Sequence, residues 1–239
     1  MEWCGASGTI DRMNSVSRSE LASFWERGYL PDAMFNYLLR LGWGHGDEEI
    51  ISREQAVEWF DMADVGKSPS RFDLAKLLNL NGHYIREADD AALASLVAAR
   101  LPLAADFDLL TRAMPVLKVR AKDVNELTEG AAFLFAERPL TLTEKAAALL
   151  TDEARERLEA IHVRLSTIQV WTLETLEASL KASAEEWGLG LGKLAQPLRA
   201  ALTGQTTSPG IFDVLVLLGR EESLARIAAQ VAAPAGSQV

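Results

Sequence analysis

The chain has 239 residues, of which 49% are hydrophobic, and its formal net charge is −10. A hydrophobic share of this size is typical of a folded protein with one or two cores, and it excludes a disordered tail. No apolar run approaches the roughly 20 residues that a membrane-spanning helix needs, so no membrane partner is expected. The acidic balance disfavours binding to phosphates over the whole surface, although a local basic face can still bind RNA.

In the first half of the chain, the spacing of apolar residues predicts a series of helices. Ser52 and Gln55 have the spacing of a capping box, in which each end of the pair satisfies a backbone N–H of the other. Gly82 is expected to end one helix, and another is expected to end before Pro115. The predicted helices cover residues 20–26, 32–41, 73–80, 89–100, 104–114 and 124–135.

In the second half, alanine and leucine recur at helical spacing almost without interruption. The glycine-rich stretch 188–193 is interpreted as a turn, because a phosphate loop would follow a strand and carry Ser or Thr after its lysine. Ser208 before Pro209 is typical of a helix N-cap. Helices are predicted at about 143–150, 152–165, 172–187, 192–203, 209–218 and 220–231, so the predicted fold class is all-α, a helical bundle.

Catalytic and metal-binding patterns are weak throughout the sequence. His45 stands near acidic residues, but no pair of histidines or cysteines has the spacing of metal ligands, so no metal site is expected. No nucleophile motif or cofactor fingerprint is present, and no catalytic residue is assigned. The single cysteine, Cys4, excludes an internal disulfide and fits a reducing, cytoplasmic location.

Two long blocks carry a family resemblance. The first begins Gly28-Tyr29-Leu30-Pro31-Asp32 and continues to residues 79–86, Asn-Leu-Asn-Gly-His-Tyr-Ile-Arg; the second covers residues 193–221 and includes Gln196-Pro197-Leu198-Arg199. Together they resemble bacterial glutamyl-tRNA synthetase from just after its catalytic core to its C-terminus. The resemblance implies a remnant of the stem-contact domain at 1–95, followed by a helical anticodon-binding domain at 96–239 with sub-bundles at about 96–140 and 141–239.

The resemblance also implies a function and a set of contacts. It predicts a module that binds tRNA, specifically tRNA(Glu), and recognises its anticodon. From chemistry alone, the basic cluster 118–122 also fits a solvated helix face, and residues 196–212 fit an ordinary helix–loop–helix. The implied anticodon contacts are Arg120, Arg199, Ser208 and Ile211, and the candidate contacts to the tRNA backbone are Lys67, Arg71, Lys118, Lys122 and Lys193.

The sequence departs from the family pattern near its start. The family has a lysine-rich loop there that stabilises ATP phosphates, whereas residues 11–18 of this chain contain no lysine. The resemblance therefore implies ATP and ligase chemistry only for the full-length glutamate–tRNA ligase, and no cofactor for this chain. Either a piece of that enzyme or a free-standing truncated paralogue fits the pattern.

A second hypothesis concerns protein binding. In a truncated paralogue, apolar residues near the start of the chain would lack the catalytic half as a neighbour. Such a face could dock on a full-length synthetase, on another enzyme or on a second copy of the chain. The residues of this N-terminal apolar face are Trp3, Leu21, Phe24 and Trp25.

Overall fold

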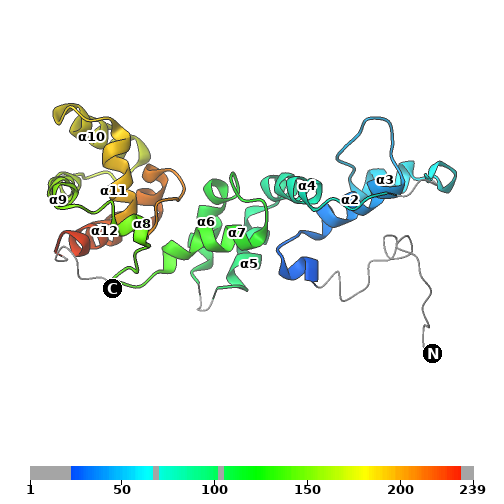
Figure 1. The fold of residues 1–239 in the computed structure, drawn as a ribbon, viewed down its shortest axis with the longest axis horizontal. Helices are drawn as coiled ribbons and strands as arrows, with labels where there is room; N and C mark the ends of the chain where they lie inside the picture. Colours follow the sequence, from blue (N-terminus) through cyan, green and yellow to red (C-terminus); the bar gives the residue numbers. More distant parts are fainter. Residues whose placement is uncertain (1–22, 67–69, 102–104, 233–239) are drawn as a thin grey trace. The chain divides into compact units, whose positions relative to one another are not determined.

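The computed structural model describes residues 23–66, 70–101 and 105–232 (Figure 1). Every regular element within these ranges is a helix, which confirms the all-α prediction. The earlier elements are α2 (Pro31–Gly42), α3 (Arg53–Trp59), the 3-10 helix η1 (Met62–Asp64), α4 (Leu74–Glu87), α5 (Asp90–Ala98), α6 (Phe107–Leu117), α7 (Val124–Ala131) and the 3-10 helix η2 (Ala132–Phe135). The later ones are α8 (Glu144–Ala147), α9 (Asp152–Ser166), α10 (Leu173–Glu186), α11 (Leu191–Thr203) and α12 (Ile211–Ala232).

The chain divides into two compact units. The first comprises Met1–Arg100 with Lys118–Thr128, and the second comprises Leu101–Leu117 with Glu129–Val239. The chain therefore enters the second unit, returns to the first and leaves again, with the last crossing inside α7. These units rest on packing contacts, and the division into domains 1–95 and 96–239 stays a prediction.

The core of the first unit forms where α2 packs against α4. Met34 and Tyr37 on α2 and Leu77 on α4 are buried together. The Tyr37 ring meets the Phe72 ring edge-on, with 4.9 Å between centroids. An edge-to-face pair of this kind adds stability beyond the area it buries. The α2–α4 pair is thus the frame on which the rest of this unit is built.

In the second unit, α9, α10 and α11 all contact α12. The contacts follow the predicted periodicity, since Leu158, Ile161 and Leu165 on one face of α9 are all fully buried. Two helices were predicted at 209–218 and 220–231, with a break between them. Gly219 has φ 73° and ψ 173°, which interrupts the helical geometry of α12 and confirms that break.

Helix starts are set by short-range chemistry that the sequence reveals well. The predicted capping box is confirmed: the Ser52 hydroxyl accepts from Gln55 N at 3.1 Å, and Ser52 N donates to Gln55 Oε1 at 2.9 Å. Asp89 and Thr151 accept in the same way from the first turns of α5 and α9. Each cap satisfies a backbone N–H that the helix itself leaves without a partner.

Two predicted helix ends are wrong. Gly82 does not stop α4, which runs on to Glu87; Gly82 is buried, and a Cβ there would lie 3.5 Å from the Lys122 Cα. A Cβ at this distance would be in ordinary van der Waals contact, so Gly82 is simply an interior residue of α4 and not its end. Pro115 lies inside α6, which ends only at Leu117. In the last turn a proline removes a single hydrogen bond, and its fixed φ still suits a helix.

Candidate functional site

Arg199 and Ser208, nine residues apart in sequence, meet at one place in the second unit. Arg199 projects from α11, and its Nη1 donates to the Ser208 hydroxyl at 2.6 Å, to the Ser208 carbonyl at 2.9 Å and to the Pro209 carbonyl at 2.9 Å. Both residues are half-buried. Hydrogen bonds from a charged guanidinium are among the stronger ones, so Arg199 holds the loop between α11 and α12 in shape.

The same contacts correct the prediction for Ser208. Its hydroxyl is engaged by Arg199 and does not cap a helix, because α12 begins at Ile211 with the Gly210 carbonyl accepting from Val214 N at 2.9 Å. Ile211 is only 5% exposed, so its side chain supports the loop from the core side. The structure thus brings three of the four predicted anticodon residues together around one loop.

The start of this loop is anchored by Gly204. Its φ of 74° lies in the left-handed region, and a Cβ there would stand 2.5 Å from the Thr141 carbonyl oxygen. The Gly204 carbonyl accepts from Thr143 N at 2.9 Å. Thr203 closes the helix by donating from its hydroxyl to the Arg199 carbonyl at 2.9 Å. The position of the loop is therefore fixed by the segment that precedes α8.

Replacing Gly204 with alanine is expected to lower the free energy of unfolding by about 1–3 kcal/mol, because the methyl group meets backbone at a left-handed φ. Gly192 offers a matched control on the same helix, since a Cβ there has nothing within 4 Å. Gly192→Ala is expected to be neutral or stabilising by up to about 1 kcal/mol. Urea unfolding of both variants checks the prediction, and equal midpoints would contradict it.

Arg120 lies elsewhere, in the basic cluster of the first unit between α6 and α7. Arg120 and Lys122 are exposed, and the Lys122 N–H donates to Glu126 Oε2 at 2.7 Å. Lys118 differs from both: its ammonium forms an ion pair with Asp90 at 2.7 Å and donates to the Ala88 carbonyl at 3.0 Å, and its side chain is 19% exposed. These contacts give Lys118 a structural role at the junction of α4 and α5.

A buried amide missed by sequence reasoning holds this cluster in place. Asn81 is fully buried, its oxygen accepts from Leu30 N at 2.7 Å, and its amino group donates to the Lys122 carbonyl at 2.6 Å and the Gly28 carbonyl at 3.3 Å. Gly28 itself accepts from Val124 N at 3.0 Å. Asn81 thus joins the Gly28 turn, α4 and the basic cluster within one unit.

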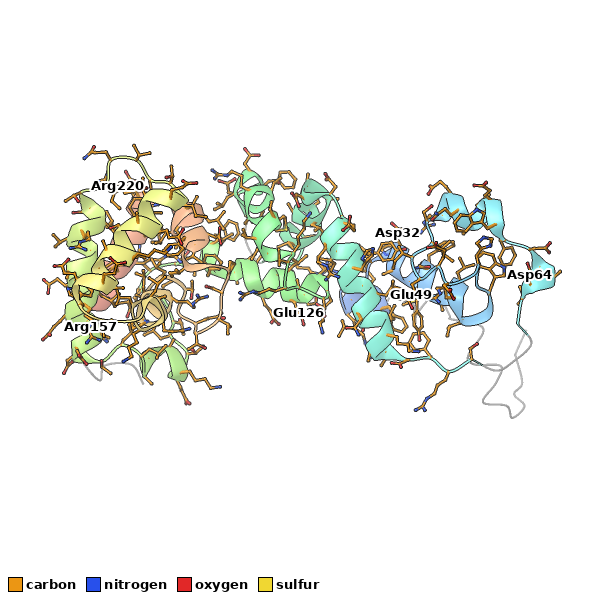
Figure 2. The ribbon with its side chains drawn as sticks, turned by 90° about the horizontal axis from the view of Figure 1, so that it is seen from above. Asp32, Glu49, Asp64, Glu126, Arg157 and Arg220 are labelled. Atoms are coloured by element: carbon orange, nitrogen blue, oxygen red, sulfur yellow. The ribbon has the colours of Figure 1, made fainter. Side chains whose placement is uncertain are left out.

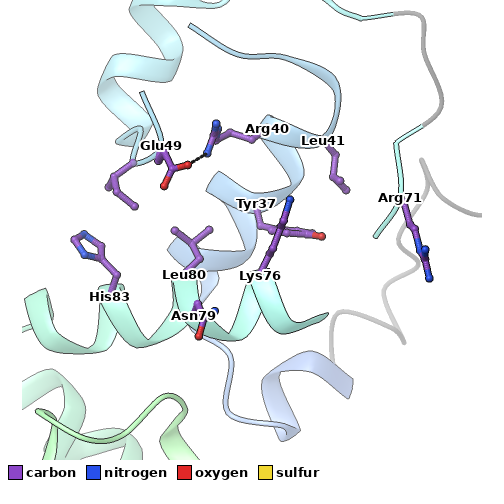
Figure 3. Close-up of a pocket in the computed structure, with 10 residues that line it drawn as sticks. Tyr37, Arg40, Leu41, Glu49, Arg71, Lys76, Asn79, Leu80 and His83 are labelled. Carbon is purple, nitrogen blue, oxygen red and sulfur yellow. Dashed lines mark ion pairs between the residues drawn. The ribbon is translucent and has the colours of Figure 1, made fainter. Parts of the chain in front are cut away.

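A second basic region of the first unit is a pocket of about 640 Å³ between α2 and α4. Figure 3 shows Lys76 and His83 along α4, facing Arg40 from α2, whose guanidinium lies 3.8 Å from Glu49. Arg71 lines its edge from the segment before α4. Lys76 and His83 are seven residues apart, a spacing that places both on one helix face and that could have revealed the pocket. Lys67 lies outside the described residues.

The remaining predicted positions are separate from these sites. Lys193 is exposed in the first turn of α11, so the predicted turn at 188–193 is right only for residues 188–190, since α11 begins at Leu191. Trp3 and Leu21 lie outside the described residues. Phe24 packs on Tyr29 and Phe72, whereas Trp25 is 42% exposed under the Arg100 guanidinium. Phe24 and Trp25 both line an apolar pocket of about 330 Å³.

Metal and membrane chemistry find no support in the part of the chain that the structure describes. No group of three or more His, Cys, Asp or Glu side chains there is placed to hold a metal ion. His45 instead stacks on Trp59, with 4.5 Å between ring centroids. Among the same residues, no helix has the length and apolar character to cross a membrane.

The comparison with known families decides the identity of the second half of the chain. Residues 91–231 match the family model described as anticodon binding domain, and this stretch contains Arg120, Arg199, Ser208 and Ile211. The chain belongs to the anticodon-binding domain family. The Arg199–Ser208 junction and the basic cluster at 118–122 both lie within the matched residues.

Relatives extend the similarity beyond the anticodon-binding domain. The chain is 69% identical over 214 residues to glutamate–tRNA ligase 2 of Novosphingobium aromaticivorans, a match that covers 87% of this chain and 44% of the relative. It is 70% identical over 205 residues to glutamate–tRNA ligase 1 of Erythrobacter litoralis, with 86% and 42% covered. The chain therefore spans less than half the length of these relatives, and its similarity to the C-terminal half of the synthetase is confirmed.

Solved structures agree. A glutamate tRNA ligase from Elizabethkingia meningosepticum superimposes with a TM-score of 0.77 at 27% identity, covering 87% of this chain and 42% of that one. Glutamate-tRNA synthetase from Elizabethkingia anophelis gives a TM-score of 0.73 at 28% identity, with 88% and 42% covered. The helical architecture of the anticodon-binding domain and of the preceding unit is thus shared with these ligases.

Proposed function

We propose that this chain binds tRNA, specifically tRNA(Glu), and contacts the anticodon loop at the Arg199–Ser208 junction. The observation that carries the proposal is the triple hydrogen bond from Arg199 Nη1 to the loop, inside the region that matches the anticodon-binding family. The similarity to glutamate–tRNA ligases supports tRNA(Glu) as the RNA. In this proposal, activation of glutamate with ATP belongs to the full-length ligase.

The junction suits a single-stranded RNA loop chemically. Bases of such a loop are splayed out, and proteins recognise them by hydrogen bonds to their edges and by stacking on planar groups. The guanidinium of Arg199 is planar and always charged. Because its Nη1 already joins the Ser208 and Pro209 carbonyls, the shape of the loop that meets the RNA depends on the same side chain. Arg199 is therefore expected to act both by contact and by positioning.

Backbone contacts are proposed for exposed cations of the first unit. Lys122 and Arg71 are exposed, and Lys76 lines the pocket beside Arg71, whereas Arg120, also exposed, stays a proposed anticodon contact. The chain as a whole carries a charge of −10, so the attraction to phosphate has to come from local groups of exposed cations such as these. Affinity is accordingly expected to fall steeply with salt, and Lys122→Ala to weaken all tRNAs alike, with a smaller salt dependence.

The first test is a titration of the purified protein into labelled tRNA(Glu) and into the same tRNA with an altered anticodon. Arg199→Ala is expected to reduce the preference for the native anticodon by about 1–3 kcal/mol, or roughly 5- to 150-fold. Arg199→Lys keeps the charge but not the fork that reaches several acceptors, so it should lose most of the same preference.

Arg112→Ala is the matched control, because Arg112 is an exposed arginine on α6, away from the loop in sequence. This variant should bind both tRNAs as the wild type does, apart from a small shift with salt. A wild-type protein that binds neither tRNA at low salt would remove the proposed function. Binding by the wild type with no loss of preference in Arg199→Ala would move the anticodon contact away from this junction.

A further inference from the structure

The segment of α3 and η1 exposes large apolar side chains within a few residues of one another. Val57 is 85% exposed and Met62 is 80% exposed, and Phe60 and Val65 between and beside them are exposed by 42% and 38%. Single exposed apolar residues are common, but a cluster of this density marks an interaction site. We call the surface formed by Val57, Phe60, Met62 and Val65 the α3–η1 surface.

A well-packed aromatic layer supports this surface. Trp43, Ile51 and Ala56 are buried together, with Trp59 packed against them. The Trp59 ring stacks on His45 with 4.5 Å between centroids, and the Phe60 ring lies 5.6 Å from Trp43. The segment therefore has its own core, and the outward position of Val57 and Met62 is not the consequence of a missing interior.

The charge around the α3–η1 surface is strongly negative. Arg53 is the sole Lys or Arg of residues 46–66, and its guanidinium is committed to Asp32 at 2.7 Å and to the face of the Phe35 ring. The backbone at the start of α3 and the Ser52 hydroxyl hydrogen-bond Glu54 and hold the pKa of its carboxyl below its usual value, so it is ionised at neutral pH. The carboxylates of the segment are Asp47, Glu48, Glu49, Glu54, Glu58, Asp61 and Asp64, of which Figure 2 labels Glu49 and Asp64. Glu49 lies 3.8 Å from the Arg40 guanidinium, so the other six supply the negative charge of this surface.

This combination of apolar and acidic groups selects among partners. RNA and anionic lipid surfaces carry negative charge and would be repelled. A second copy of the chain would place the same carboxylates against one another, in a protein whose net charge is already −10. A helix with an apolar face flanked by Lys and Arg would satisfy both features, because its apolar side chains cover Val57 and Met62 while its cations meet the carboxylates.

We propose that the α3–η1 surface is a docking site for a basic amphipathic helix of a partner protein. The inference is independent of tRNA binding, since it rests on residues of the first unit that the proposed RNA contacts do not include. Apolar contact supplies the affinity, and charge complementarity supplies the rate of association and the choice of partner. The interaction is therefore expected to weaken as the salt concentration rises.

The test uses the full chain and a dye-labelled Leu/Lys peptide of roughly 18 residues, or five helical turns, with leucine at positions i, i+3, i+4 and i+7. Fluorescence anisotropy reports binding. The double variant Val57→Lys/Met62→Lys is expected to weaken binding about tenfold or more, because it removes the apolar contact and adds repulsion. The double variant Glu54→Gln/Glu58→Gln should weaken binding and lower its salt dependence.

Val163→Lys/Val170→Lys is the matched control, because both valines are exposed apolar residues, at 60% and 61%, and lie in the second unit. This control should bind the peptide as the wild type does. Equal binding of a peptide with the same composition in scrambled order would overturn the proposal, as would equal losses in the two lysine double variants. A wild-type dimer in light scattering that the Val57/Met62 variant dissociates would instead assign the surface to a second copy, and a loss of tRNA affinity in that variant would assign it to RNA.

Discussion

Arg226→Ala is expected to lower the free energy of unfolding by about 3–5 kcal/mol. Arg226 is 2% exposed and donates four hydrogen bonds: to the carbonyls of Phe133 at 2.8 Å, Leu202 at 2.7 Å and Ala136 at 3.0 Å, and to Glu222 at 2.6 Å. Alanine removes one donor from each of three carbonyls, of which the Phe133 carbonyl still accepts from Ala136 N, and it leaves a cavity where the side chain was. Each buried polar group that loses its partner costs about 1–3 kcal/mol.

The loss is expected to come mainly from the carbonyls. Glu222 also lies 3.4 Å from Arg138, so its charge keeps one partner when Arg226 is removed. Arg226→Met fills more of the cavity than alanine but restores no donor, and it should recover only part of the stability. Urea unfolding followed by circular dichroism measures all three proteins.

Arg157→Ala provides the comparison, because Arg157 on α9 is partly exposed and forms an ion pair with the exposed Glu153 one turn away. Such pairs contribute about 0.3–0.5 kcal/mol. If Arg226→Ala unfolded within 1 kcal/mol of the wild type, as Arg157→Ala should, the network around Arg226 would not be a stabilising element. Loss of the network should also loosen the end of α11 at Leu202, just before the loop between α11 and α12 begins.

The sequence predicted those helices and helix starts that depend on residues close together in the chain. Helix α9 was found because its apolar residues recur at helical spacing, and the start of α3 because Ser52 and Gln55 are three residues apart. Arg199 and Ser208 are only nine residues apart, and both were predicted as site residues. The prediction that Ser208 caps a helix was wrong. A serine hydroxyl before a proline can accept either from a backbone N–H at a helix start or from a nearby arginine. The spacing of the residues alone does not show which of the two donors it meets.

What the sequence could not show depends on residues far apart in the chain. Arg226 meets carbonyls 90 and 93 residues away, and Asn81 donates to the Lys122 carbonyl, 41 residues further along the chain. In the sequence, Lys118 is one basic residue of a cluster, like Arg120 and Lys122. The fold shows that Lys118 differs, because it forms an ion pair with Asp90. Exposure is non-local for the same reason: no pattern marks Val57 and Met62 as outward-facing, since either could have packed in a core.

Asn81→Ala is expected to destabilise the first unit by about 2–4 kcal/mol. The change removes the partner of the buried Leu30 N–H and of the half-buried Lys122 carbonyl, whereas the Gly28 carbonyl loses one donor and keeps Val124 N. Hydrogen exchange should rise selectively at the amides of Leu30 and Val124, because the turn at Gly28 and the start of α7 lose their link to α4. Urea unfolding gives the total loss.

Asn79→Ala is the matched control, since Asn79 has the same side chain on the same helix but is exposed. It should unfold within about 0.5 kcal/mol of the wild type. Because Asn81 holds the Lys122 carbonyl, its loss should also weaken the proposed contact of Lys122 to the tRNA backbone, by the same factor for native and altered anticodons. A variant that unfolds normally but loses anticodon preference would mean that Asn81 acts on the RNA-reading loop, which its hydrogen bonds do not reach.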